Sequence, residues 1–134
     1  MKQVIQLDQQ LKERILNMET EFETICKKLE KANQKYFERY EYQIVIELIR
    51  VKSGKGAKSL DIFEDDYESF IEIGIEHEGE YYPNTYIPIW KCKTEWFQKI
   101  GYLTKQNNVD LENKLQLIIK EMLEDAEVSS SEDR

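Results

Sequence analysis

The sequence predicts an α+β fold in which a long N-terminal helix precedes an antiparallel meander of three to four strands and then C-terminal helices, in the order α-β-β-β-α. Three observations predict it. Apolar residues follow a heptad spacing within residues 8–39, alternate with polar residues in 71–77, and lie on one helical face in 109–127. The length of 134 residues fits a single domain, which we place at residues 1–127.

The N-terminal helix is the clearest element of the pattern. From Leu11 onward, apolar residues recur at spacings of four and three, and neither Gly nor Pro interrupts residues 1–53. We therefore predict a continuous helix over about residues 8–39, with Asp8 as its N-cap. The apolar stripe consists of Leu11, Ile15, Met18, Phe22, Ile25, Leu29, Ala32 and Tyr36.

This stripe is longer than a compact monomer is expected to cover. A helix of about 32 residues is roughly 48 Å long, whereas a globule of this size is roughly 36 Å across. We therefore predict a homodimer in which two stripes meet as a coiled coil through Leu11, Ile15, Met18, Phe22, Ile25 and Leu29. In a parallel dimer, Arg14 and Glu19 would pair across the seam. The alternative is a helix that lies across its own sheet.

The central part of the chain has the period of strands. We predict strands at residues 42–49, 59–63, 71–77 and 85–92. Turns are expected at 53–56 and at Gly79, and Pro88 indicates that its strand lies at an edge of the sheet, because proline cannot donate to a neighbouring strand.

The C-terminal part has the spacing of helices. Thr94 is placed to cap a short helix that Gly101 would end, and a longer amphipathic helix is predicted at 109–127. The remaining residues, 128–134, are acidic and rich in serine, and we expect them to be disordered.

Acidic residues are concentrated in one segment. The net charge of −8 argues against direct nucleic-acid binding. Residues 61–80 contain nine acids and neither Lys nor Arg: Asp61, Glu64, Asp65, Asp66, Glu68, Glu72, Glu76, Glu78 and Glu80. A solvated strand face explains the acids after residue 70, whereas Glu64, Asp65, Asp66 and Glu68 are candidates to bind a basic protein surface.

Seven aromatic residues lie within residues 81–102. Tyr82, Tyr86 and Trp90 are expected on the strand face opposite Ile87 and Ile89, where they would form an exposed patch that anchors a partner. Packing in the core is the alternative explanation for these side chains.

The sequence offers no pattern of catalytic, metal-binding or cofactor-binding residues. His77, the single histidine, continues the apolar face of its strand and has no candidate nucleophile beside it. Cys26 and Cys92 are expected to be free thiols with a structural role. The segment Ser53-Gly54-Lys55-Gly56 lacks the spacing of a phosphate-binding loop.

These features together favour a non-enzymatic protein–protein interaction module, of the kind found among homodimeric inhibitors, adaptors and immunity proteins. The 49 Lys, Ile, Asn, Tyr and Phe residues against 14 Ala, Gly, Arg and Pro indicate AT-rich codons, and hence a low-GC bacterium, its phage or its plasmids as the source. A phage or mobile-element origin also fits the size of the chain. No apolar run suits a signal peptide or a membrane span, so a cytoplasmic location is expected. Two alternatives stay open: an acidic mimic of nucleic acid, and a small-ligand binder or enzyme that uses carboxylates of residues 61–80.

Overall fold

The computed structural model describes residues 1–132. Its elements are β1 (Lys2–Val4), α1 (Gln9–Glu38), β2 (Gln43–Lys52), β3 (Lys55–Gly56), the 3-10 helix η1 (Ser59–Asp61), β4 (Tyr67–His77), β5 (Glu80–Glu95), β6 (Gln98–Leu103) and α2 (Asn108–Glu132). The chain is therefore α+β, as predicted, with six antiparallel strands in place of the expected three to four.

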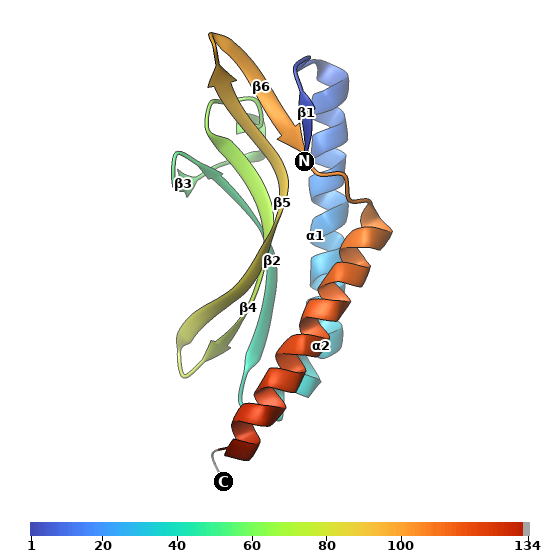
Figure 1. Ribbon diagram of the computed structural model, residues 1–134, viewed down its shortest axis with the longest axis vertical. Coiled ribbons are helices and arrows are strands. Elements are labelled where there is room, and N and C mark those ends of the chain that lie inside the picture. Colours follow the sequence, from blue (N-terminus) through green and yellow to red (C-terminus); the bar gives the residue numbers. More distant parts are fainter. Residues whose placement is uncertain (133–134) are drawn as a thin grey trace.

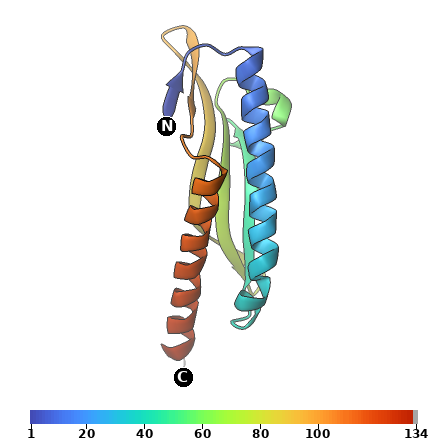
Figure 2. The same ribbon diagram turned by 90° about the vertical axis from the view of Figure 1, so that its right-hand side faces the viewer.

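The molecule has two layers (Figures 1 and 2). One is the sheet, with the strand order β1-β6-β5-β4-β2-β3, and the other consists of α1 and α2, which lie side by side on the same face of the sheet. The core lies between the layers. The sheet face away from the helices is covered by neither helix, and we call it the outer face.

Helix α1 begins and ends close to the predicted limits. The Asp8 side chain accepts a hydrogen bond from the backbone N–H of Leu11 at 2.9 Å, which confirms Asp8 as the N-cap. The predicted dimer seam is wrong, because its residues fill the core of their own chain: Leu11, Ile15, Phe22 and Leu29 are buried, and Met18 and Ile25 are half-buried against the same core. The sheet runs along the full length of α1, since β5 alone has 16 residues. An elongated monomer can therefore cover a helix that a sphere could not.

Glu19 lies on the buried face of α1, so it is not placed to pair with Arg14 of a second copy. It has no exposed surface, and its carboxylate accepts hydrogen bonds from Arg50 Nε at 3.0 Å and from the Tyr67 hydroxyl at 2.8 Å. Burial opposes the charge on Arg50, but the adjacent Glu19 carboxylate outweighs it and raises the pKa of the guanidinium. The three side chains tie α1 to β2 and β4.

Both prolines of the chain stand at irregularities of β5. The register between β4 and β5 shifts between Ser69 and Phe70, opposite Pro88, and again between Ile73 and Gly74, opposite Pro83. Strand β6 pairs only with Trp90–Glu95, so the part of β5 that contains the prolines has a paired strand on one side. The edge position predicted for Pro88 is confirmed for this part of the strand.

Three predicted elements differ from the structure. Residues 59–61 form η1 where a strand was expected. Residues 94–101 do not form a helix: they belong to the hairpin of β5 and β6, because a tight turn at residues 96–97 reverses the chain. Helix α2 continues to Glu132, so residues 128–132 of the expected disordered tail are helical, and residues 133–134 lie outside the described range.

The open edge of β2 is occupied by side chains of α1. The backbone N–H of Ile46 donates to Glu30 Oε2 at 2.7 Å, and Gln34 Nε2 donates to the carbonyl of Ile44 at 2.9 Å. These contacts satisfy backbone groups that would otherwise be available to another strand, and the prolines protect the open part of β5 in a different way. These stretches of β2 and β5 are therefore less suited to pairing with a strand of a partner.

Candidate functional site

The hairpin of β5 and β6 ends in an unusual pair of residues. Three two-residue turns join neighbouring strands, and both residues of each have positive φ: Ser53-Gly54, Glu78-Gly79 and Trp96-Phe97. Turns of this kind favour glycine because a side chain in the left-handed region is strained. Two of the turns follow this rule, whereas the third carries Trp96 at φ 52° and Phe97 at φ 67°.

Trp96 and Phe97 are almost completely exposed. Their relative exposures are 94% and 103%, the highest among the large apolar side chains of residues 1–132. The next highest is Leu60, at 77%, which lies in η1. The hairpin tip and the segment that contains η1 lie at the same end of the molecule (Figure 1). This end therefore presents three large apolar side chains that have little or no burial within the chain.

An acidic loop lies beside this hairpin. Lys99 Nζ of β6 donates to the carbonyl of Phe63 at 3.0 Å, which fixes the loop between η1 and β4 against the hairpin. The next three residues, Glu64, Asp65 and Asp66, are exposed, and none takes part in an ion pair among the described residues. We use the name tip surface for Leu60, Glu64, Asp65, Asp66, Trp96 and Phe97.

Glu68, the fourth acid predicted for the partner site, is in a different situation. It lies on β4 opposite Lys91 of β5, and Lys91 Nζ is 3.4 Å from its Oε1. Its charge is therefore balanced within the sheet, and we leave it out of the tip surface.

The predicted patch of Tyr82, Tyr86 and Trp90 does not exist, because the two register shifts in β5 separate its members. Tyr86 is exposed on the outer face, with its ring centroid 5.8 Å from that of Phe70. Tyr82 pairs with Ile75 on the helix side and is half-exposed. Trp90 is 1% exposed, and its Nε1 donates to the carbonyl of Ile62 at 2.7 Å.

The two thiols are buried, and the histidine lies at the end of β4 that is far from the acidic loop. The His77 ring packs edge-to-face with Tyr42, at a centroid distance of 4.9 Å. Burial raises the pKa of the Cys26 thiol to about 12 and that of the Cys92 thiol to about 11, so both thiols stay protonated at neutral pH. Within residues 1–132, no group of three His, Cys, Asp or Glu side chains is arranged to hold a metal ion.

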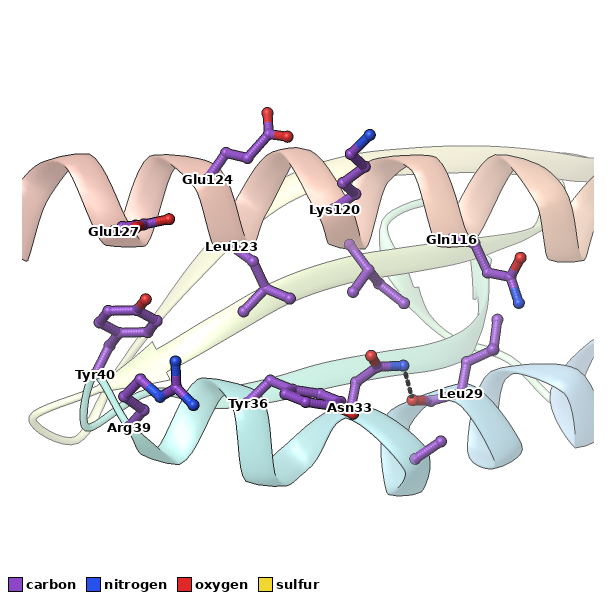
Figure 3. Close-up of a pocket in the computed structure, with 12 residues that line it drawn as sticks. Leu29, Asn33, Tyr36, Arg39, Tyr40, Gln116, Lys120, Leu123, Glu124 and Glu127 are labelled. Atoms are coloured by element: carbon purple, nitrogen blue, oxygen red, sulfur yellow. Dashed lines mark hydrogen bonds between the residues drawn. The ribbon is translucent and has the colours of Figure 1, made fainter.

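A second feature is a groove of about 550 Å³ between α1 and α2 (Figure 3). Its apolar lining comes from Leu29, Ala32, Tyr36, Ile119 and Leu123. Charged side chains border it: Arg39 on the α1 side, and Lys120, Glu124 and Glu127 on the α2 side. The sequence pattern indicated both halves of this lining, since Ala32 and Tyr36 end the apolar stripe and Ile119 and Leu123 lie on the apolar face of the predicted C-terminal helix.

Comparisons of the chain with models of protein families, with curated proteins and with solved structures find no match. No helix of the described residues is both long and apolar enough to cross a membrane.

Proposed function

We propose that this chain is a non-enzymatic protein-binding module, which engages a partner protein through the tip surface. The single observation that carries the proposal is the Trp96-Phe97 turn. Two aromatic side chains occupy strained backbone positions while nearly all of their surface contacts solvent. Such a turn costs stability and gains nothing from burial, and strain of this kind is concentrated at binding sites. Tryptophan is also the residue most enriched among binding hot spots.

The acidic loop defines the chemistry of the partner. Glu64, Asp65 and Asp66 place three negative charges beside the aromatic tip, and Lys99 is the neighbouring cation. A complementary partner has an apolar pocket for Trp96 and Phe97 with a basic rim facing the loop. Insertion of a rigid hairpin tip into such a pocket suits an inhibitor, adaptor or immunity-type protein of a phage or mobile element acting in the cytoplasm.

The two alternatives are less well supported by the same residues. A mimic of nucleic acid depends on an extended acidic surface, whereas the acids here lie beside the most exposed apolar side chains of the described chain. A carboxylate-based ligand site would need a cavity lined by residues 64–66, whereas the groove of about 550 Å³ lies between α1 and α2.

The test begins with isolation of the partner from cells of the source organism, using the full chain as bait. The affinity of the purified partner is then measured for the wild type and for Trp96→Ala and Phe97→Ala. We expect each variant to lose about 2 kcal/mol or more, which is a roughly 30-fold rise in Kd. Tyr86→Ala is the matched control, because Tyr86 is also exposed and aromatic but lies on the outer face.

Charge reversal tests the second part of the surface. Reversal of Glu64, Asp65 and Asp66 to lysine should slow association, while reversal of Glu13, Glu121 and Asp125, exposed acids of the helices, should change it little. Equal effects of the two triple variants would contradict a specific acidic site. Binding that ignores Trp96 and Phe97 but falls steeply with salt would instead favour the nucleic-acid mimic.

A further inference from the structure

We propose that the groove between α1 and α2 is a homodimer interface. In the dimer, this groove faces the same groove of a second copy of this chain. The two-fold axis runs along the groove, so that α1 of each copy lies on α2 of the other. This proposal is independent of the partner proposed for the tip surface. It shares only Leu29 with the predicted seam, because the other residues of that seam are buried in the chain itself or half-buried against its core.

The side-chain hydrogen bonds between the two helices lie on one side of the groove along the helix axes. The hydrogen bonds that connect their side chains in residues 1–132 involve the beginning of α2, where Lys28 Nζ donates to Glu112 at 2.6 Å and Asn108 donates to Glu21 at 3.0 Å. Further along, Ala32 is too small to fill the gap. Asn33 donates to the carbonyl of Leu29 in its own helix at 2.8 Å (Figure 3). Apolar lining is therefore left for another chain to cover.

The charges of the two helices identify a second copy as the occupant. Residues 27–39 of the α1 region contain five Lys and Arg against two Glu, whereas residues 108–132 of α2 contain seven acids against two Lys. Lys27 and Lys28 are already paired with Glu23 and Glu112 of the same chain, and Glu30 is bonded to the β2 edge. Lys31, Lys35 and Arg39 therefore supply the basic charge of this segment. Each copy therefore presents a basic helix beside an acidic one, and a two-fold axis between them brings opposite charges together twice.

The arrangement of side chains along the groove agrees with this axis. Arg39 and Glu127 lie across from each other at one end, and Tyr36 and Leu123 lie across from each other beside them (Figure 3). Rotation about the groove axis leaves each residue at the same position along that axis. Arg39 of one copy therefore meets Glu127 of the second copy. Tyr36, which is 44% exposed, would then pack on Leu123 of the second copy.

Sedimentation equilibrium tests the proposal with the full chain. The wild type is expected to have twice the mass of the 16.1 kDa chain. Arg39→Glu and Glu127→Lys should each raise the dimer dissociation constant about tenfold or more, because each places like charges together twice. An equimolar mixture of the two variants should recover a heterodimer of nearly wild-type affinity. In that heterodimer the two substituted side chains face each other with opposite charges, and the native Arg39 and Glu127 form the second contact.

Recovery in the mixture would show that the two charges act between copies. Within each variant chain the substituted charge stays unfavourable, and mixing does not change it. Lys55→Glu, in the exposed hairpin of β2 and β3, is the control and should leave the mass unchanged. A monomeric wild type over the whole accessible concentration range would overturn the proposal. So would a dimer that tolerates both reversals, or a mixture that dissociates as readily as the separate variants. Circular dichroism confirms that each variant is folded.

Discussion

Arg50 Nε donates a hydrogen bond to Glu19 Oε1 across 3.0 Å, and the Glu19 side chain has no exposed surface. The Tyr67 hydroxyl donates to the other carboxylate oxygen at 2.8 Å. The buried charge is thus satisfied from two strands at once, because Arg50 belongs to β2 and Tyr67 to β4. This contact fixes how far α1 can slide or rotate on the sheet, and the positions of both the groove and the acidic loop depend on it.

Replacing Arg50 and replacing Glu19 should destabilise the fold by different amounts. Arg50→Ala leaves Glu19 buried with one remaining donor and should cost about 3–5 kcal/mol. Glu19→Ala should cost less, about 2–3 kcal/mol, because Arg50 is 25% exposed and can be partly hydrated. Urea unfolding measures both free energies. Glu23→Ala, which breaks the exposed Glu23–Lys27 pair, is the control and should change stability by less than about 0.5 kcal/mol. The reverse order of the two losses would contradict this interpretation.

Gly101 is required where Trp90 packs on β6. A Cβ atom at Gly101 would lie 1.9 Å from an atom of the Trp90 ring, whose Nε1 is held by Ile62. Gly101→Ala should therefore displace the indole and destabilise the protein by about 1–3 kcal/mol. Gly56→Ala is the matched control, since nothing lies within 4 Å of its added methyl group. Thermal unfolding compares the two, and equal melting temperatures would refute the close packing.

Replacing the Trp96-Phe97 turn with Asn-Gly should stabilise the fold and abolish partner binding. Asn and Gly are preferred in turns where both residues have positive φ, and the two aromatic side chains lose no packing because they are exposed. We expect a gain of about 1 kcal/mol in the free energy of unfolding. A less stable Asn-Gly variant would mean that the aromatic residues support the hairpin, and the argument from strain would then fail.

The two buried thiols should make the free energy of unfolding depend on pH in the alkaline range. Burial raises the pKa of Cys26 from 9.0 to about 12 and that of Cys92 from 9.0 to about 11, and burial also raises the pKa of Tyr67. The folded chain keeps these protons when the unfolded chain has lost them. Their contribution is therefore complete below pH 9.0 and is lost as pH rises through 11 and 12.

Urea unfolding across this range should show a free energy that falls steadily above pH 9.0. At about pH 8 the native protein should not react with a thiol reagent that needs the thiolate, and two thiols should react in urea. Rapid reaction of either cysteine in the native protein would contradict the burial described here.

Much of the fold could be predicted from periodicity, and the errors have identifiable physical causes. The heptad spacing located α1. The buried side of the helix, however, also includes Glu19 and Cys26, which directly follow the predicted core residues Met18 and Ile25. A glutamate at a core position was not expected, because the partners that satisfy it come from distant strands. The length of β5 was not expected either, since no local pattern predicts an elongated sheet.

The candidate site was predicted only in part. Glu64, Asp65 and Asp66 were selected from charge alone, and they lie beside the exposed aromatic tip. Tyr82 and Trp90 were assigned to the wrong face because alternation fails at the shifts near Pro83 and Pro88; prolines within a strand are the signal that could have indicated this. Trp96 and Phe97 were assigned to a helix, since a tight turn without glycine has no recognisable sequence pattern.

Site-specific photo-crosslinking from the hairpin tip shows directly whether the tip surface binds a partner protein. A benzophenone amino acid replaces Phe97 in one variant and Tyr86 in a second, and each is expressed in cells of the source organism. We predict a covalent adduct with one protein from position 97, no such adduct from position 86, and loss of the adduct when Glu64, Asp65 and Asp66 are reversed to lysine in the same chain. The same adducts from both positions, or none from position 97, would contradict a protein-binding role of the tip surface.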